Sequence, residues 1–225
     1  MASIGALCLL TTSCSGTPSQ TAVFPVIGTT ESAADNTARQ LAYALAHWND
    51  YNAVAYGDLN PVGGDCANFV SQALIARGWL MNSEWYSRDA AADWSPAWGY
   101  VPAMDNYLHA HAAELGIQRL PLTQRDKVKV GDIVMFDWDD NDSLDHVQIV
   151  SAIERAGDAI RVKMVGHNKD TVYRDLDDTI SIDPALSATS GRCRDDPRRP
   201  SRDPRGHRLG RDRACYLAGG LRRRI

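Results

Sequence analysis

The chain has 225 residues, of which 44% are hydrophobic, so it can bury one sizeable core and needs no second domain. Its formal net charge of −4 at pH 7 is unevenly distributed. Residues 1–186 hold 12 Lys and Arg against 24 Asp and Glu, a net charge of −12, whereas residues 187–225 hold 12 Arg against 4 Asp, a net charge of +8. This acidic body excludes the continuous basic face of a nucleic-acid-binding protein.

The first 34 residues have the composition of an export leader followed by a tether. Residues 1–14 are apolar and rich in small side chains, but no Lys or Arg precedes them, so the signal is incomplete. Thr11–Cys14 resembles a weak bacterial lipobox, and residues 15–34 are rich in Thr, Ser and Pro. No run reaches the ~20 apolar residues of a membrane span. We therefore expect a secreted protein, or a cell-envelope lipoprotein anchored to the membrane by a lipid on Cys14.

Of the five cysteines, only Cys66 lies in the expected domain, residues 35–186. Cys8 and Cys14 belong to the leader, and Cys193 and Cys215 belong to the Arg-rich end. Cys66 therefore has no disulfide partner within the domain, and no CxxC pair is present to bind zinc. We expect neither a metal nor a cofactor.

Three segments of the first half of the domain predict helices. In residues 35–48, Leu41, Leu45 and Trp48 recur at helical spacing, and either Asp35 or Asn36 can cap the start of the helix. Residues 66–76 carry an apolar stripe that ends at a glycine, and residues 102–115 suggest a third, short helix. Between the last two segments lie four of the six tryptophans, which suit a substrate groove and a core equally well.

The second half of the domain predicts antiparallel strands, so the fold class is α+β, with N-terminal helices packed on an antiparallel sheet. A strand over residues 129–137 leads into an acidic loop, and residues 146–153 and 159–165 form a hairpin with Ala156-Gly157 as its loop. In this register His146 lies opposite His167, and both share the sheet face that is not apolar. A slip of two residues keeps them on one face, whereas a slip of one residue separates them.

Cys66 stands at the start of the second predicted helix, directly after Gly63-Gly64-Asp65. A helix amino terminus favours a thiolate, and neighbouring glycines let backbone amides approach a substrate oxyanion. A cysteine hydrolase also needs an imidazole to take the thiol proton and a polar group to orient it, which two adjacent strands can supply. Taken alone, however, a lone cysteine is more simply a small buried apolar residue, and a lone histidine a polar strand-end residue.

The segment Gly64–Gln72 resembles the Asp-Cys-Thr-Asn-Phe-Val-Ser-Gln signature of the putative amidase domain family, with Ala67 in place of the family's Thr. That family is a branch of the papain-like hydrolases related to the NlpC-type and CHAP enzymes. Weaker resemblances follow in the family's order at residues 52–56, 78–79, 131–134, 145–146 and 166–170. The resemblance spans about residues 36 to 180.

The resemblance implies a papain-like fold and cysteine-dependent hydrolysis of an amide bond. It implies that Cys66 is the nucleophile, that His146 is the general base, and that His167 orients His146, with Asn168 as the fallback. We expect a monomer that acts on a peptide or peptidoglycan-like substrate. Three residues are expected to contact that substrate: Asp65, Asn68 and Trp98.

The Arg-rich end, residues 187–225, departs from the family, whose domain should finish with apolar strand sequence. Arg, Asp, Pro and Gly dominate here, a composition that predicts a disordered tail. An out-of-frame reading of GC-rich coding sequence would give the same composition, and we take a frame-shifted end as the preferred hypothesis. The alternative is a genuine basic tail that binds anionic wall polymers.

Two other classes of function compete with hydrolysis by cysteine. One is a catalytically inactive peptide- or glycan-binding module on the same fold. The other is a metal-dependent hydrolase that uses Asp145, His146 and His167, although no HExxH pattern is present. The acidic loop, with Asp137 and Asp139, faintly resembles a Ca²⁺ site but lacks the Gly and Glu of an EF-hand, which favours a solvated loop.

Overall fold

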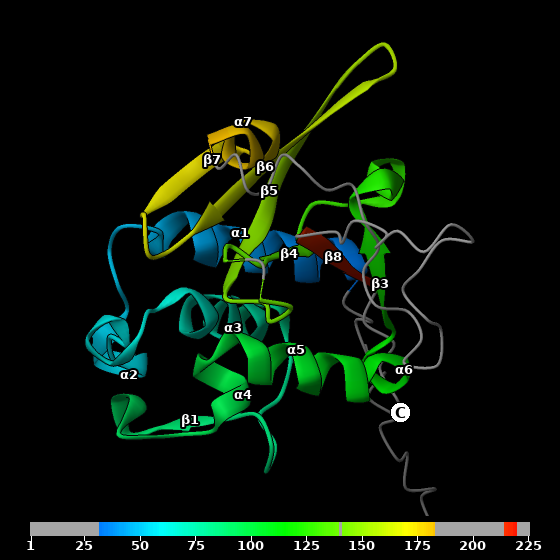
Figure 1. Ribbon diagram of the computed structural model, residues 1–225. Coiled ribbons are helices and arrows are strands. Elements are labelled where there is room, and N and C mark those ends of the chain that lie inside the picture. The colour runs from blue at the N-terminus through cyan, green and yellow to red at the C-terminus, as the bar shows by residue number, and fades with distance from the viewer. Residues whose placement is uncertain (1–31, 140, 183–213, 220–225) are drawn as a thin grey trace, which may run out of the picture. The chain divides into compact units, whose positions relative to one another are not determined.

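A computed structural model describes residues 32–139, 141–182 and 214–219 of the chain (Figure 1). The predicted leader, most of the tether and most of the Arg-rich tail lie outside these residues. The helices and strands follow in this order: α1 (Ala33–His47), α2 (Ala53–Tyr56), η1 (Asn60–Val62), α3 (Cys66–Arg77), β1 (Ser87–Arg88), η2 (Asp89–Ala91), β2 (Asp93–Trp94), α4 (Pro96–Gly99), α5 (Val101–Ala110), α6 (Ala112–Leu115), β3 (Ile117–Pro121), η3 (Leu122–Lys127), β4 (Ile133–Phe136), β5 (His146–Ala156), β6 (Ala159–Gly166), β7 (Thr171–Asp175), α7 (Leu176–Ile182) and β8 (Ala214–Gly219).

The three predicted helices are present, with small changes at their ends. Helix α1 begins two residues earlier than expected because Ser32, rather than Asp35, is its N-cap, and the two residues form a capping box. Helix α3 begins at Cys66 as predicted and ends before Gly78, whose φ of 105° suits the left-handed C-cap position. The third helix is divided at His111 into α5 and α6.

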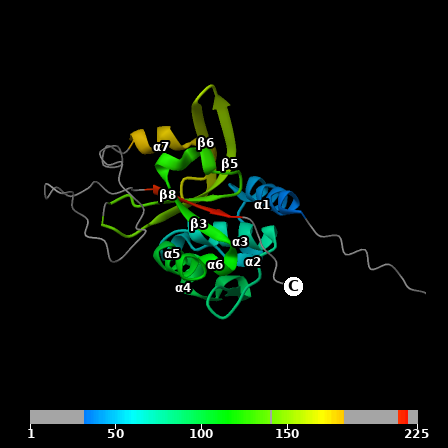
Figure 2. The same ribbon diagram turned by 90° about the vertical axis from the view of Figure 1, so that its right-hand side faces the viewer.

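A six-stranded antiparallel sheet, in the order β3-β8-β4-β5-β6-β7, forms the centre of the domain. In both ribbon views the helices α3–α6 lie on one side of this sheet, and α7 lies on the other (Figures 1 and 2). Helices and an antiparallel sheet in separate layers confirm the α+β class. The predicted hairpin is also present, as β5 and β6.

The side chains of the sheet alternate between two apolar clusters, as the period of two in a strand requires. The first cluster joins α3 to the sheet residues Ile133, Met135, Val147, Ile149 and Val165. The second lies on the opposite face and joins α7 to the sheet residues Val134, Phe136, Val150, Val162 and Met164. The strand partner of a residue near the start of β5 therefore shows on which of the two sheet faces its side chain lies.

The hairpin register differs from the predicted one for two reasons. The loop is Gly157-Asp158 rather than the predicted Ala156-Gly157, since Ala156 pairs with Ala159, and β5 contains an irregularity around Ser151. Near the turn, Ile153 lies opposite Val162 rather than Ile160, a slip of two residues that keeps every side chain on its predicted face. Beyond the irregularity, Ile149 lies opposite Val165 rather than Met164. That is a slip of one residue, so the expected shared face for the two histidines is wrong.

Six residues of the Arg-rich end, Ala214–Gly219, form strand β8 between β3 and β4. The prediction that the whole of 187–225 is disordered is therefore wrong for these six residues. These six residues carry no charge, and their backbone groups pair with those of β3 on one side and of β4 on the other. The rest of the tail lies outside the described residues.

Among the described residues, none of the helices combines the length and the apolar character needed to cross a membrane.

Candidate active site

Cys66 is the first residue of α3, and its side chain is 5% exposed within the cluster between that helix and the sheet. Burial raises the pKa of the Cys66 thiol to about 11, while backbone hydrogen bonds from Val147, Ala67 and Cys66 itself act in the opposite direction. The thiol is therefore protonated near pH 7. Backbone amides of the first helical turn and of strand β5 nevertheless converge on its sulfur, where they would stabilise a thiolate.

His146 is the first residue of β5 and is 7% exposed. Its ring packs against the rings of Phe136 and Trp138, with 5.8 Å between centroids in each pair. Burial lowers the pKa of His146 to about 4, and the positive charges of Arg174 and Lys169 lower it further. The imidazole is therefore neutral near pH 7 and has a nitrogen free of its proton, as a general base requires.

Cys66 and His146 are neighbours through the backbone rather than through their side chains. One of the three backbone amides that act to lower the pKa of the thiol belongs to Val147, the residue directly after His146. His146 pairs with Phe136 and so lies on the opposite face of the sheet from Val147. Within the described residues no hydrogen bond joins the sulfur of Cys66 to the imidazole of His146.

His167 lies on the same sheet face as Val165 and packs against α3 instead of facing His146. Its ring lies between those of Tyr51 and Phe69, at centroid distances of 3.7 and 4.1 Å. Its Nδ1 lies 2.6 Å from Oδ2 of Asp65, and its Nε2 lies 2.8 Å from the backbone oxygen of His47. Both ring nitrogens are thus occupied, so the expected hydrogen bond from His167 to His146 is absent from this geometry.

Asn168, the predicted fallback, also faces the start of α3. Its Oδ1 accepts a hydrogen bond of 2.7 Å from the backbone amide of Asp65. Gly64 makes this approach feasible, because a Cβ at that position would lie 2.3 Å from Nδ2 of Asn168 and its φ of +130° disfavours other residues. The structure therefore places Asn168 against the loop before Cys66. A role for it in orienting His146 stays a prediction.

The three residues expected to contact substrate are all buried and bonded to one another. Asn68 donates from Nδ2 to Oδ1 of Asp65 at 2.8 Å, and its Oδ1 accepts from Nε1 of Trp98 at 2.7 Å. Nδ2 of Asn68 also donates to the backbone oxygen of Tyr56 at 3.2 Å. Their polar atoms therefore face the interior network behind Cys66, and their contact with a substrate stays a prediction.

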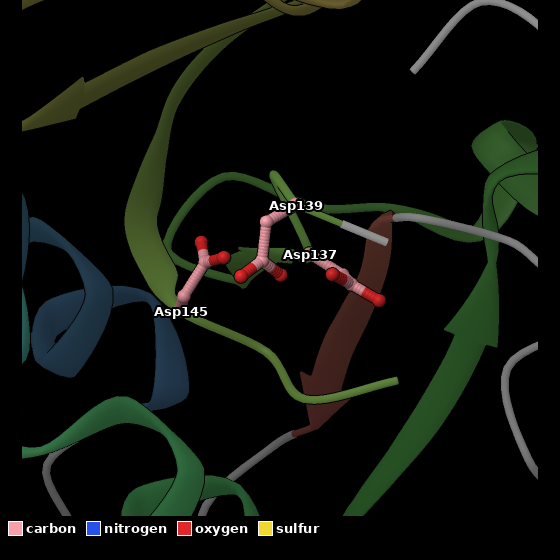
Figure 3. Close-up of side chains that lie close together, drawn as sticks. All are labelled: Asp137, Asp139 and Asp145. Atoms are coloured by element: carbon pink, nitrogen blue, oxygen red, sulfur yellow. The ribbon is translucent and has the colours of Figure 1, made fainter. Parts of the chain in front are cut away.

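The acidic loop before His146 brings three carboxylates together, those of Asp137, Asp139 and Asp145 (Figure 3). Their candidate ligand oxygens lie within 4.8 Å of one another, and burial and the neighbouring charges of Asp139 and Asp137 raise the pKa of Asp145. Oxygen ligands of this kind are those that hard cations prefer. Asp137 accepts the backbone amides of Asn141 and Asp142, and Asp145 accepts that of Trp138, so bonds within the loop account for its shape.

Four residues that matter to this site were missed by sequence reasoning. Tyr51 stacks on the ring of His167. The backbone oxygen of His47 accepts a hydrogen bond from Nε2 of His167. Lys169 and Arg174 bring positive charge towards His146. No local pattern marks these residues, because their roles depend on which strands and loops the tertiary fold brings together.

A comparison with models of known families finds that residues 34–189 match the model described as the putative amidase domain. No curated protein and no solved structure matches the chain.

Proposed function

Because the chain belongs to the putative amidase domain family, which describes hydrolases of amide bonds, we propose that it cleaves its substrate with Cys66 as the nucleophile. The observation that carries this proposal is the position of Cys66. It begins the 12-residue helix α3, and backbone amides of that helix and of Val147 in strand β5 act to lower the pKa of its thiol. An arrangement of this kind stabilises a thiolate and, in the next step, a substrate oxyanion.

His146 is the general base of the proposed reaction. Its pKa, lowered to about 4, leaves the imidazole neutral near pH 7 and able to take the thiol proton. The backbone places His146 next to Val147, whose amide contacts the sulfur. The ring must turn away from Phe136 and Trp138 around the start of β5 to reach Cys66. The reaction therefore requires the backbone at the start of β5 to rearrange, because rotation of the side chain alone cannot carry the ring to the other sheet face.

The reaction proceeds in two steps, formation of a thioester and its hydrolysis. The imidazole takes the thiol proton as the sulfur attacks the amide carbonyl carbon, and the carbon–nitrogen bond then breaks as the imidazolium returns the proton to the leaving amine. Water next attacks the resulting thioester, with the imidazole as base, which releases the carboxylic acid and restores the thiol. The two products are an amine and an acid.

Peptidoglycan is the proposed substrate, cleaved at a stem-peptide amide or at the amide between sugar and peptide. Support comes from the export-like leader and the cysteine of its lipobox-like segment, which together indicate a protein of the cell envelope. Secretion or lipid anchoring on Cys14 belongs to the same proposal.

A second candidate is a catalytically inactive module that binds peptide or glycan on the same fold. The specific observation in its favour is that the thiol of Cys66 is protonated near pH 7 and shares no hydrogen bond with His146 among the described residues.

Hydrolysis of purified peptidoglycan, followed by the release of amino groups, distinguishes the two candidates. The Cys66→Ser variant should lose activity by at least about a hundredfold while it still folds, because a hydroxyl is a far poorer nucleophile than a thiolate. His146→Ala should lower turnover by a similar factor, whereas Cys193→Ser should leave it unchanged. Full activity in Cys66→Ser would exclude the cysteine mechanism. Inactivation by EDTA rather than by iodoacetamide would favour the metal-dependent class.

A further inference from the structure

A buried polar pair joins Asp65 to His167. Nδ1 of His167 lies 2.6 Å from Oδ2 of Asp65, and each side chain is 1% exposed. Oδ1 of Asp65 also accepts the backbone amide of Leu59 and Nδ2 of Asn68, both at 2.8 Å. A buried pair of this kind persists only when its remaining donors and acceptors are satisfied, as they are here.

The hydrogen-bond partners of His167 limit where its ring protons lie. A backbone oxygen only accepts, so Nε2 of His167 must carry a hydrogen to bond with the oxygen of His47. The amide of Leu59 and Nδ2 of Asn68 both donate to Oδ1 of Asp65, whereas Oδ2 of Asp65 faces Nδ1 of His167 at 2.6 Å. One hydrogen therefore lies between Nδ1 and Oδ2.

The carboxylate of Asp65 does not cap the helix that it precedes. Asp65 is the N-cap residue of α3, yet its side chain makes no hydrogen bond to the first-turn amides, which is the usual role of an N-cap aspartate. Its carboxylate instead contacts Nδ1 of His167 and the backbone amide of Leu59. The first-turn amides thereby stay available to the sulfur of Cys66.

We infer that the hydrogen between Nδ1 and Oδ2 lies on His167, and that His167 is a positioning residue that acts on Cys66 through Asp65 and does not orient the base. As an imidazolium, it neutralises the negative charge beside the thiol and holds the carboxylate away from the amides that stabilise a thiolate. This inference rests on the proposed function only in taking Cys66 as the nucleophile.

The other groups around the imidazole hold the ring in a fixed position. Tyr51 from the segment after α1 stacks on the ring, and its hydroxyl donates to Asp170 at 2.7 Å. Phe69 from α3 covers the ring as well. Asn168, which follows His167, accepts the Asp65 amide. Asp65 is thus the ionisable group to which a ring nitrogen bonds, and the ring is shielded from water.

The rate at which iodoacetamide alkylates Cys66 tests the inference without any substrate. The rate is measured on the Cys66 peptide by mass spectrometry, because the chain has five cysteines. In His167→Gln the charge of Asp65 is no longer balanced, so the thiolate is disfavoured and the rate at pH 8 should fall about tenfold. Asp65→Asn combined with His167→Gln removes both charges and should restore the rate to within about twofold.

The direction of the change separates this role from a merely structural one. A loosened structure would expose the buried thiol and speed alkylation, whereas the inference requires it to slow. His109→Gln, at an exposed histidine, is the matched control and should change nothing. An unchanged or faster rate in a folded His167→Gln variant would overturn the inference.

Nitrogen NMR of the unmodified chain decides the question if His167→Gln does not fold. Both ring nitrogens of His167 should carry hydrogen at pH 7, and a bare Nδ1 at that pH would overturn the inference. The outcome is independent of the proposed function. A chain that shows the expected alkylation pattern but leaves peptidoglycan intact would keep the positioning role and refute the hydrolase.

Discussion

The two residues of the proposed reaction are both uncharged near pH 7. Burial raises the pKa of the Cys66 thiol to about 11 and lowers that of His146 to about 4, so a thiolate–imidazolium pair is disfavoured in the free protein. Proton transfer must then accompany attack on the substrate rather than precede it. At this scale, the site is a thiol with backbone amides near it, and the neutral imidazole belongs to His146, the residue before Val147, which supplies one of those amides.

Burial of His146 also makes the stability of the fold depend on pH. Its pKa falls from 6.5 to about 4 on folding, so between these values the unfolded chain binds a proton that the folded chain does not. The free energy of unfolding therefore decreases as the pH falls through this window, by up to about 3 kcal/mol for this group. In His146→Gln the loss between pH 7 and pH 5 should be about 2 kcal/mol smaller, as measured by urea unfolding at each pH.

The exposed His109 provides the control for that measurement, since His109→Gln should retain the pH dependence of the unmodified chain. If His146→Gln loses as much stability on acidification as the unmodified chain, the histidine is not buried as the structure places it.

Sequence reasoning correctly predicted that Cys66 begins a helix, because glycines before an apolar stripe are a local signal. It could not predict what each histidine contacts. The partners of His167 are Asp65 and the backbone of His47, which are 102 and 120 residues away in sequence. Contacts at such separation depend on strand register and loop conformation, which no local pattern specifies.

At the scale of elements, one irregularity in β5 decides the arrangement of the site. The hairpin and the alternation of its strands were predictable, since both follow from short-range sequence patterns, but its loop is Gly157-Asp158 rather than the predicted Ala156-Gly157. The shift between Val150 and Ala152 was not, because an extra residue in one strand leaves the apolar alternation on either side intact. That single residue turns His167 towards α3 and leaves His146 on the other face.

The absence of a side chain at Gly166 on β6 leaves room for a side-chain hydrogen bond between the strands on either side, β5 and β7. Nε2 of Gln148 on β5 donates to Oγ1 of Thr171 on β7 at 3.1 Å, across Gly166. A Cβ at Gly166 would lie 2.8 Å from Cγ of Gln148, so Gly166→Ala must displace that side chain. We expect the variant to lose about 1–3 kcal/mol of the free energy of unfolding, measured by urea denaturation.

A double-mutant cycle identifies the cause of that loss. In the Gln148→Ala background, Gly166→Ala should reduce the free energy of unfolding by at least about 0.5 kcal/mol less, because the side chain that it would displace is gone. Gly157→Ala is the matched control: its Cβ would meet nothing within 4 Å, so its effect should be the same in both backgrounds. Equal effects of Gly166→Ala in the two backgrounds would contradict the predicted contact.

At the scale of the whole molecule, the sheet is completed by residues from the far end of the chain. Strand β8 pairs with β3 on one side and with β4 on the other, so it connects β3 to the rest of the sheet. Composition concealed this strand, because six uncharged residues lie within an Arg-rich end whose overall pattern predicts disorder. The α+β class was predictable from the order of helices and strands, whereas the position of the last strand depends on a gap that only the assembled sheet presents.

Removal of residues 214–225 tests the role of this strand. Without β8, strand β3 loses its neighbour in the sheet and β4 keeps only β5, so the amides of Ile117–Pro121 should exchange with solvent at least about tenfold faster. The amides of β5 and β6 should stay protected, since their pairing is unaffected. A chain that ends at residue 219 is the control and should exchange like the full chain. Hydrogen exchange read by mass spectrometry resolves these segments. Equal protection of β3 in the chain that ends at residue 213 would show that the tail contributes no strand, as expected for a frame-shifted end.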